Sequence, residues 1–222
     1  MVSVTDTSVH VHDALNGSLK SLQEGDAVKA LTLANQALAS LSSNSFPTPT
    51  AEILRAKAHH RRAQALLALE DPVEAVREYR SALANPALTA ALPLPQRSAL
   101  GAAAALTLGR LPPFWLASLW ARRVAEAERP GRLSSRDGRF LKPVRTLQAA
   151  AGGKLEPLDR PSLQAALKQA FAADAGLADE GRRLLVEGWL AAGQSRGGRE
   201  MHAGVAFFRA AAYLTAGRGG AA

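Results

Sequence analysis

Cysteine is absent from the 222-residue chain, and aromatic residues make up only 5% of it. Without cysteine the chain can form no disulfide, no thiolate metal site and no cysteine nucleophile. The hydrophobic residues, 47% of the sequence, are therefore mostly alanine and leucine, which have high helix propensities. Residues typical of strands are correspondingly few, and no long stretch alternates polar and apolar positions. These absences predict an all-α fold.

The motifs of common enzyme classes are also missing. The sequence contains no glycine-rich phosphate loop after a strand, no Gly-x-Ser-x-Gly and no His-Glu-x-x-His. His59 and His60 are adjacent on a predicted helix and point about 100° apart, which disfavours joint metal ligation. A weak metal site at His10, His12 and Asp13 competes with a mobile N-terminus as the interpretation of those residues. We therefore expect a protein that is not an enzyme and has no metal, catalytic residue or cofactor.

No run of about 18 apolar residues suggests a membrane span. Residues 1–11 lack the basic region and apolar core of a secretory signal. We therefore expect a cytoplasmic protein with no membrane partner.

Charge is distributed unevenly along the chain. Residues 1–95 hold 8 Lys or Arg and 9 Asp or Glu, a net charge of −1. Residues 96–222 hold 19 and 10, a net charge of +9. This asymmetry indicates either a polyanionic or acidic partner for the second half, or a genomic preference for arginine.

Apolar periodicity, Gly and Pro divide the chain into helices and connectors. Gly25 predicts a left-handed helix cap, and Asp26 predicts the N-cap of the next helix. Helices are expected at 12–24, 27–41, 51–69, 72–85, 96–108, 114–128, 162–173, 177–192 and 199–216, with a short helix at 143–151. The predicted organisation is a flexible N-terminus at 1–11, helical repeats at 12–128, a basic connector interrupted by Gly and Pro at 129–160, C-terminal helical hairpins at 161–216 and a disordered tail at 217–222.

Small residues recur at fixed offsets after three of the predicted turns. Ala30, Ala75 and Ala117 hold the first offset, 45 and 42 residues apart. A small residue at this offset lets the two helices of a hairpin approach closely. The larger residue four positions later fills the gap between neighbouring hairpins, and the small residue seven positions later leaves space for the next hairpin. The pattern predicts an α-solenoid of antiparallel helix hairpins with three to four degenerate repeats.

One unit of this pattern resembles the tetratricopeptide repeat (TPR) family. The matching residues are Ala63, Leu66, Asp71, Ala75, Tyr79, Ala82, Leu83 and Pro86. The resemblance covers 12–86 and extends loosely over 96–127, with a degenerate fourth unit around Gly193, Ala203, Phe207 and Ala210. It implies stacked helix hairpins that bind a peptide or helix in a concave groove.

The chain departs from the family pattern in three ways. Its repeats are longer than the family's 34 residues. His59 and Arg62 stand where the family usually has a large aromatic residue and a leucine. The paired Asn and Lys with which some members hold a carboxylate are not reproduced, so we do not predict a binder of chaperone tails.

Register with the family consensus implies that Lys57, His60, Arg61 and Gln64 lie on or near the groove. Such a row could receive carboxylates or backbone carbonyls of a bound protein segment. The alternative interpretation is a solvated helix face.

A second candidate site is a basic stretch at 122–145, which holds eight cations and three acidic residues. Several arginines close together could neutralise nucleic-acid phosphates, although interleaved aromatic residues are missing. The alternative is a solvated linker. The candidate nucleic-acid contacts are Arg122, Arg123, Arg129, Arg132, Arg136, Arg139, Lys142 and Arg145, with help from Arg182, Arg183, Arg196 and Arg199.

Two aromatic groups complete the set of candidates. Trp115 and Trp120 cannot share one helix face, so we expect one in the core and one exposed to anchor a partner, or both packed between hairpins. For Phe207 and Phe208 the same two interpretations apply, an exposed anchor for a partner or packing in the core.

The leading hypothesis is therefore a non-catalytic TPR-like adaptor that binds a protein segment. The alternative is a protein that binds DNA or RNA through the arginines on a helical scaffold, and a structural subunit of a larger assembly is a third interpretation. The sequence leaves the partner and the oligomeric state open.

Overall fold

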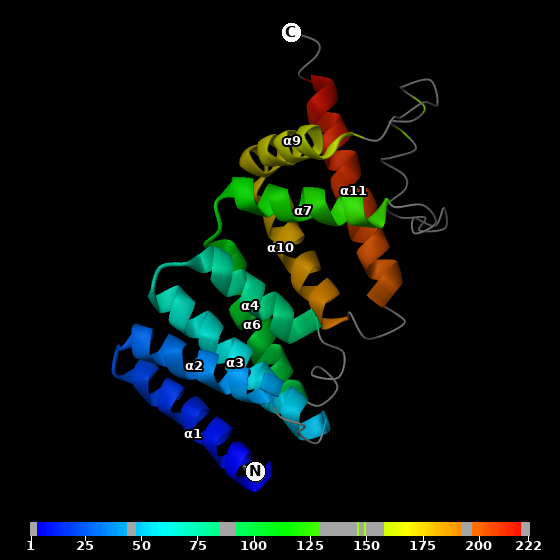
Figure 1. Cartoon of the computed structure of the whole chain (residues 1–222). Coiled ribbons are helices and arrows are strands. Elements are labelled where there is room, and N and C mark those ends of the chain that lie inside the picture. Colours follow the sequence, from blue (N-terminus) through cyan, green and yellow to red (C-terminus); the bar gives the residue numbers. More distant parts are fainter. Residues whose placement is uncertain are drawn as a thin grey trace. The chain divides into compact units, whose positions relative to one another are not determined.

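In a computed structural model of the chain, every regular element of the described residues is a helix (Figure 1). The structure describes residues 4–43, 48–84, 92–128, 146, 149, 158–191 and 197–218. The prediction of an all-α fold is confirmed for these residues.

The helix boundaries lie close to those predicted, with one larger difference at the N-terminus. The helices are α1 (Val4–Gln23), α2 (Ala27–Ser43), α3 (Thr48–Ala68), α4 (Pro72–Ala84), α6 (Leu94–Gly109), α7 (Pro113–Ala127), α9 (Arg160–Ala173), α10 (Ala175–Leu190) and α11 (Gly197–Arg218). The first helix begins at Val4 instead of His12, and Val11 of this added stretch is buried in the core. Similarly, α11 continues through Gly217 and Arg218, two positions of the predicted tail. The short helix predicted at 143–151 lies almost entirely outside the described residues.

The chain divides into two compact units. Unit 1 comprises residues 1–110 and 189–194, and unit 2 comprises residues 111–188 and 195–222. The division between Arg110 and Leu111 falls inside the predicted repeat region 12–128.

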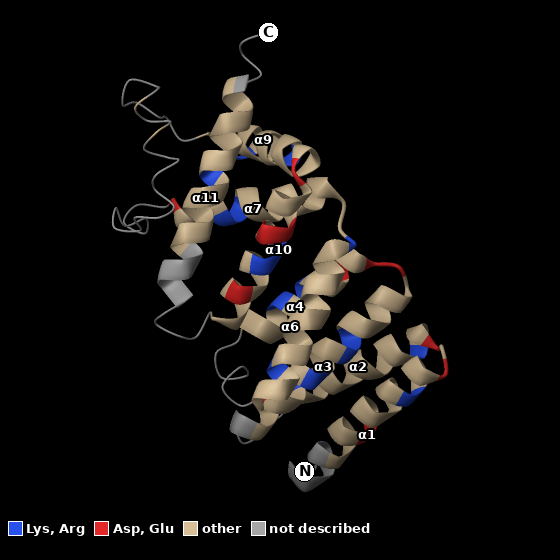
Figure 2. Cartoon of the chain, turned by 180° about the vertical axis from the view of Figure 1, so that it is seen from behind, with Lys and Arg blue, Asp and Glu red and all other residues tan. Residues whose placement is uncertain are grey.

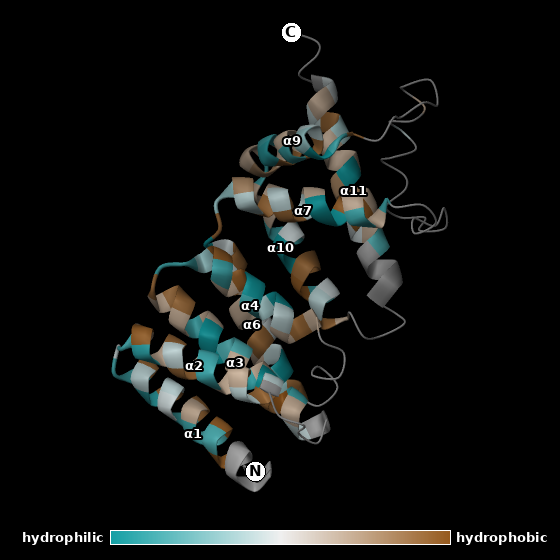
Figure 3. Cartoon of the chain, viewed as in Figure 1, coloured by the Kyte–Doolittle hydropathy of each residue, from teal (hydrophilic) through white to brown (hydrophobic). Residues whose placement is uncertain are grey.

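In unit 1, each helix packs against the next along the chain. α1 contacts α2 and α3, α2 contacts α3, α3 contacts α4, and α4 contacts α6. Hydrophobic and hydrophilic stretches alternate along these helices in Figure 3, as expected for helices that bury one face. One core cluster joins α1, α2 and α3 through Val11, Leu15, Ala37, Leu41, Ala51, Leu54 and Ala58.

Alanine dominates the helix contacts of unit 1. Ala30 and Ala75, two of the alanines predicted at the first offset, have no exposed surface. Ala34 and Tyr79, four positions later, are also buried, as are Ala37 and Ala82 seven positions later. The third predicted alanine, Ala117 of unit 2, is likewise fully buried. A methyl side chain at these points lets neighbouring helix axes approach closely.

The turns α1–α2 and α3–α4 have the same hydrogen bonds. In the first, Gly25 N–H donates to Leu22 O, and Asp26 N–H donates to Ser21 O at 2.8 Å. In the second, Glu70 N–H donates to Leu67 O, and Asp71 N–H donates to Leu66 O at 2.9 Å. This pair of bonds is the Schellman motif, whose penultimate residue adopts a left-handed conformation. Accordingly, φ is 80° at Gly25 and 60° at Glu70.

The aspartate after each left-handed residue caps the following helix. Asp26 Oδ1 accepts from Lys29 N–H, and Asp71 Oδ1 accepts from Glu74 N–H, each at 3.0 Å. Both caps satisfy backbone donors that the first helical turn leaves unpaired. The two turns are therefore one structural device used twice, with Gly25 replaced by Glu70 in the second.

Unit 2 is built around Trp120 on α7. In this unit α7 contacts α9 and α11, and α9 contacts α11. Trp120 has no exposed surface, and its ring centroid lies 4.2 Å from that of Phe208 on α11. Phe171 of α9 meets Phe208 edge-on at 5.6 Å, and Trp120 Nε1 donates to the backbone oxygen of Gly181 on α10 at 3.1 Å. Burial of the tryptophan therefore leaves no indole N–H unpaired.

The aromatic residues of unit 2 separate as the helical geometry predicts. Trp120 and Phe208 lie in the core, whereas Trp115 is 39% exposed and Phe207 is partly buried. Asp159 is the N-cap of α9, because its Oδ1 accepts from Ser162 N–H at 2.9 Å.

The turn at Glu70 generates a stability prediction. A residue with a side chain is strained at a φ of 60°. We therefore expect Glu70→Gly to raise the free energy of unfolding by about 1 kcal/mol in urea denaturation. The matched variant Gly25→Ala should lower it by a similar amount through the backbone alone, because a Cβ at Gly25 would have no heavy atom within 4 Å. Loss of stability in Glu70→Gly would contradict this account of the turn.

The core of unit 2 generates a second prediction. A Cβ at Gly181 would lie 3.0 Å from Trp120 Nε1 and 3.1 Å from Phe208 Cζ. Because both rings are fully buried, we expect Gly181→Ala to lower the free energy of unfolding by about 1–3 kcal/mol. Gly109→Ala is the control, since a Cβ there would have open space and should leave stability unchanged or slightly higher. Equal effects of the two substitutions would refute tight packing at Gly181.

Candidate functional site

Unit 1 contains a pocket with a volume of about 340 Å³ on the faces of α1, α3 and α6. Its lining residues are His12, Leu15, Asn16, Ala56, Lys57, His60, Arg61, Leu92, Gln96, Ala99 and Leu100. Lys57, His60 and Arg61, three of the four residues predicted at a groove, lie in this lining. The fourth, Gln64, accepts a hydrogen bond from Arg61 Nη1 at 2.7 Å and so helps to orient the guanidinium.

Helical spacing explains why each helix contributes its residues together. Positions separated by three and four residues share one helix face. Lys57, His60 and Arg61 have this spacing on α3, and α1 and α6 repeat it with the triplets His12, Leu15, Asn16 and Gln96, Ala99, Leu100. The pocket thus lies where three helix faces converge.

The residues from α1 and α6 were not predicted as site residues. His12 was considered only as a weak metal ligand beside His10 and Asp13. Among the described residues, no group of three His, Cys, Asp or Glu could hold a metal ion. The i, i+3, i+4 spacing of polar and small residues was a visible signal, but the sequence does not show which three helices converge.

The charged residues of the pocket are both basic. No Asp or Glu is among its lining residues, whereas Lys57 and Arg61 are cationic at neutral pH. Figure 2 shows basic residues along α3, while acidic residues mark the α1–α2 and α3–α4 turns. Within the described residues, neither Lys57 nor Arg61 forms an ion pair. The pocket can therefore offer two charges to an anionic group.

His60 is held neutral by its surroundings. Burial, and secondarily the positive charge of Arg61, lowers its pKa from 6.5 to about 4. Burial also lowers the pKa of Arg61. The His60 ring lies 5.9 Å from that of Tyr79 on α4, measured between centroids. Tyr79 is almost fully buried and forms a hydrogen bond with Thr107 of α6. The His60 imidazole therefore packs beside a buried tyrosine and is neutral at pH 7.

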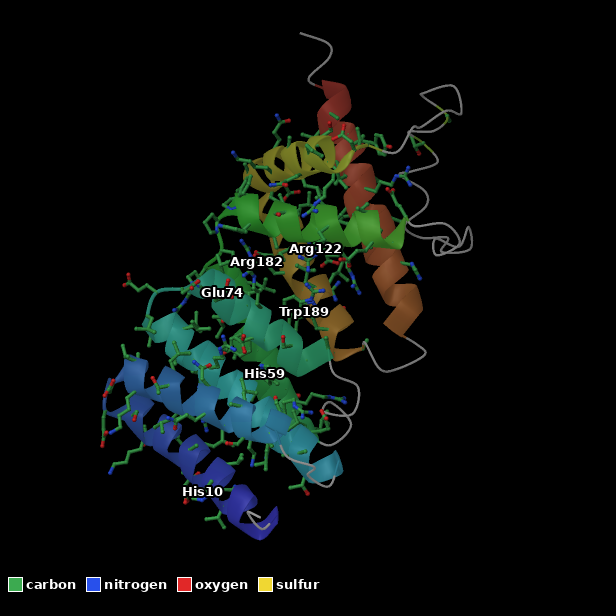
Figure 4. All side chains as sticks on the ribbon, in the orientation of Figure 1. His10, His59, Glu74, Arg122, Arg182 and Trp189 are labelled. Atoms are coloured by element: carbon green, nitrogen blue, oxygen red, sulfur yellow. The ribbon has the colours of Figure 1, made fainter. Side chains whose placement is uncertain are left out.

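The adjacent His59 takes part in a different cluster (Figure 4). Its Nδ1 lies 2.8 Å from Oε2 of Glu78 on α4, and Arg62 Nη1 lies 3.5 Å from Oε1 of the same carboxylate. Glu78 is only 8% exposed. His59 and Arg62 are the positions at which the chain departs from the TPR consensus, and both face this buried acid. These side chains form a polar contact between α3 and α4.

The described candidates for nucleic-acid contact pair with acidic neighbours on their own helices. Arg122 Nε lies 3.2 Å from Glu126 Oε1, and Arg123 also pairs with Glu126. Arg182, labelled with Arg122 in Figure 4, pairs with Asp179. Arg183 pairs with two acids, Glu180 and Glu187. Outside the described residues lie Arg129, Arg132, Arg136, Arg139, Lys142, Arg145 and Arg196, and only the backbone of Arg199 is described.

Comparison with protein-family models, curated proteins and solved structures finds no significant match to this chain. No helix in the described part of the chain is both long enough and apolar enough to cross a bilayer.

The lowered pKa of His60 predicts how stability depends on pH. Between pH 6.5 and 4 the unfolded chain binds this proton more readily than the folded chain, so the free energy of unfolding falls as pH falls. From pH 7 to 4.5 we expect the wild type to lose about 2–3 kcal/mol more than His60→Gln, measured by urea denaturation. His10→Gln, which changes an exposed imidazole, should behave as the wild type. Parallel pH curves for wild type and His60→Gln would exclude a buried neutral imidazole.

Proposed function

We propose that this protein is a non-catalytic helical adaptor that binds an acidic protein segment in the pocket of α1, α3 and α6. The observation that carries the proposal is the lining of that pocket, where Lys57 and Arg61 meet no carboxylate. Charge-assisted hydrogen bonds from such cations to carboxylates are stronger than bonds between neutral groups.

The resemblance of the sequence to the TPR family supports the same proposal. The helix pairs α1–α2 and α3–α4 would be successive hairpins of one stack, since they share the turn geometry of Gly25-Asp26 and Glu70-Asp71. They also share buried alanines at Ala30 and Ala75. In such a stack α1 and α3 are the first helices of consecutive hairpins, the helices that line the binding groove of proteins this chain resembles, and α6 follows as the next helix packed on α4.

The size and composition of the pocket favour a side chain from an extended segment. A volume of about 340 Å³ lies at the lower end of the range for small-molecule sites. Leu15, Leu92 and Leu100 provide apolar contacts beside the cations, and Asn16 and Gln96 provide amides. Such a lining can accept an acidic side chain together with backbone groups of the segment that carries it.

The nucleic-acid alternative draws less support from the described residues. Arg122, Arg123, Arg182 and Arg183 each have a carboxylate neighbour, which a phosphate would have to displace. Exposed ion pairs of this kind are weak, so a phosphate could displace the carboxylate at a small cost in free energy. The carboxylates nevertheless leave little net positive charge on these helix faces.

A charge-reversal experiment tests the adaptor. The probe is a fluorescein-labelled peptide of Asp-Gly-Ser repeats, with an Asn-Gly-Ser peptide as the neutral comparison, and binding is measured by fluorescence anisotropy. We expect Lys57→Glu with Arg61→Glu to weaken binding about a hundredfold, because two charge-assisted hydrogen bonds are lost. Helical circular dichroism should be unchanged.

The matched control reverses two exposed cations outside the pocket, Lys29 of α2 and Arg77 of α4, to Glu. It has the same net charge as the test variant and should bind the acidic peptide within a few-fold of the wild type. Equal losses in both variants would attribute binding to overall charge. A wild type that prefers duplex DNA, in a manner sensitive to Arg132→Ala, Arg136→Ala and Arg139→Ala, would overturn the adaptor in favour of the alternative.

A further inference from the structure

The charges around His60 favour its neutral form when the pocket is empty. An acidic ligand in the pocket would favour the protonated form instead. Among the lining residues, the ionisable groups near it are His12 on α1 and Lys57 and Arg61 on α3, while α6 contributes none. From α4 it meets Tyr79. All the charged groups in this set are cationic, so an empty pocket disfavours a further positive charge on the imidazole.

We propose that His60 takes up a proton when an acidic side chain binds in the pocket, so that ligand binding and protonation are coupled. This inference rests on the proposed function, and it adds a regulatory property to the same site. The protonated imidazole has two N–H donors, whereas the neutral ring has one. The bound carboxylate would thereby gain a third cationic contact besides Lys57 and Arg61.

The size of the coupling follows from electrostatics. A unit negative charge about 4 Å from the imidazole, at the effective dielectric of a protein surface, favours the protonated ring by a factor of about a thousand. That factor is large enough to offset the burial and the neighbouring guanidinium that keep the free ring neutral. Because the carboxylate of Asp is still ionised at pH 5.5, ligand and histidine can carry opposite charges at mildly acidic pH.

Linkage turns this into a measurable change of affinity. Where the complex binds one more proton than the free protein, affinity rises as pH falls. If the bound imidazole regains its ordinary pKa of about 6.5, the affinity for an acidic peptide increases about tenfold between pH 7.5 and 5.5. Salt bridges from lysine and arginine side chains to an Asp ligand would give no such change, since the ordinary pKa values of these residue types lie outside this range.

The second imidazole of the pocket has to be separated from the first. His12 is exposed, and its protonation would add a charge to the same lining. The test therefore uses His12→Gln as the parent, with His60→Gln added to it. His10→Gln serves as a control for an exposed imidazole of α1 outside the lining.

The experiment measures anisotropy of the Asp-Gly-Ser peptide at pH 7.5, 6.5 and 5.5 and constant ionic strength. We expect His12→Gln to bind about tenfold more tightly at pH 5.5 than at 7.5, His10→Gln to tighten at least as much, and His12→Gln with His60→Gln to show less than a twofold change. Persistence of the tightening in that double variant would overturn the inference.

The coupling can also be tested on the wild-type protein, without any substitution. NMR titration of the imidazole signals should give His60 a pKa of about 4 in the free protein and a higher pKa with saturating peptide. The same pKa in both states would overturn the coupling while leaving the adaptor in place. Failure of the peptide to bind at any pH would instead overturn the proposed function, and the coupling with it.

Discussion

Close approach of helix backbones is the constraint on which both units depend. In unit 1 the contacts are made by alanines such as Ala30 and Ala75, which have no exposed surface. In unit 2 the small residue is Gly181, whose missing side chain leaves room for the Trp120 indole to reach a backbone oxygen. Larger residues at these positions would push the helices apart and open voids between them. A chain poor in aromatic residues can therefore still form dense cores, provided that its small residues recur at the contact points.

The use of alanine at helix contacts also determines where the polar side chains of unit 1 lie. Alanines occupy the contacts between helices, so the long polar side chains lie on the remaining helix faces or pair with a few specific residues. Glu78 gathers His59 and Arg62 between α3 and α4, while His60, Lys57 and Arg61 turn towards the pocket. One helix thus divides its basic residues between an internal contact and a surface open to a ligand.

Much of the fold could be read from local signals. Asp71, Asp26 and Asp159 cap helices as their residue types suggest, and the alternation of Trp115 and Trp120 follows from helical geometry. These features depend on residues within one or two turns of each other.

Features that depend on distant residues were not predictable. The convergence of His12, Lys57 and Gln96 on one pocket depends on how three helices rotate about their axes, and no spacing within one helix encodes that rotation. Residue type also gave no sign that Glu70 adopts a left-handed conformation, because the surrounding hydrogen bonds of the turn impose it. The early start of α1 was not predicted, because the sequence before His12 shows no i, i+3, i+4 apolar stripe of its own.

The pocket also links parts of the chain that are far apart in sequence, since His12 and Leu100 border the same space. Occupancy would add to the stability of unit 1 by mass action. Amide hydrogen exchange should then slow in α2 and α4 as well, although neither contributes a lining residue, because they pack on α1 and α3. A small anchor held by three helices would in this way reduce local opening throughout the unit.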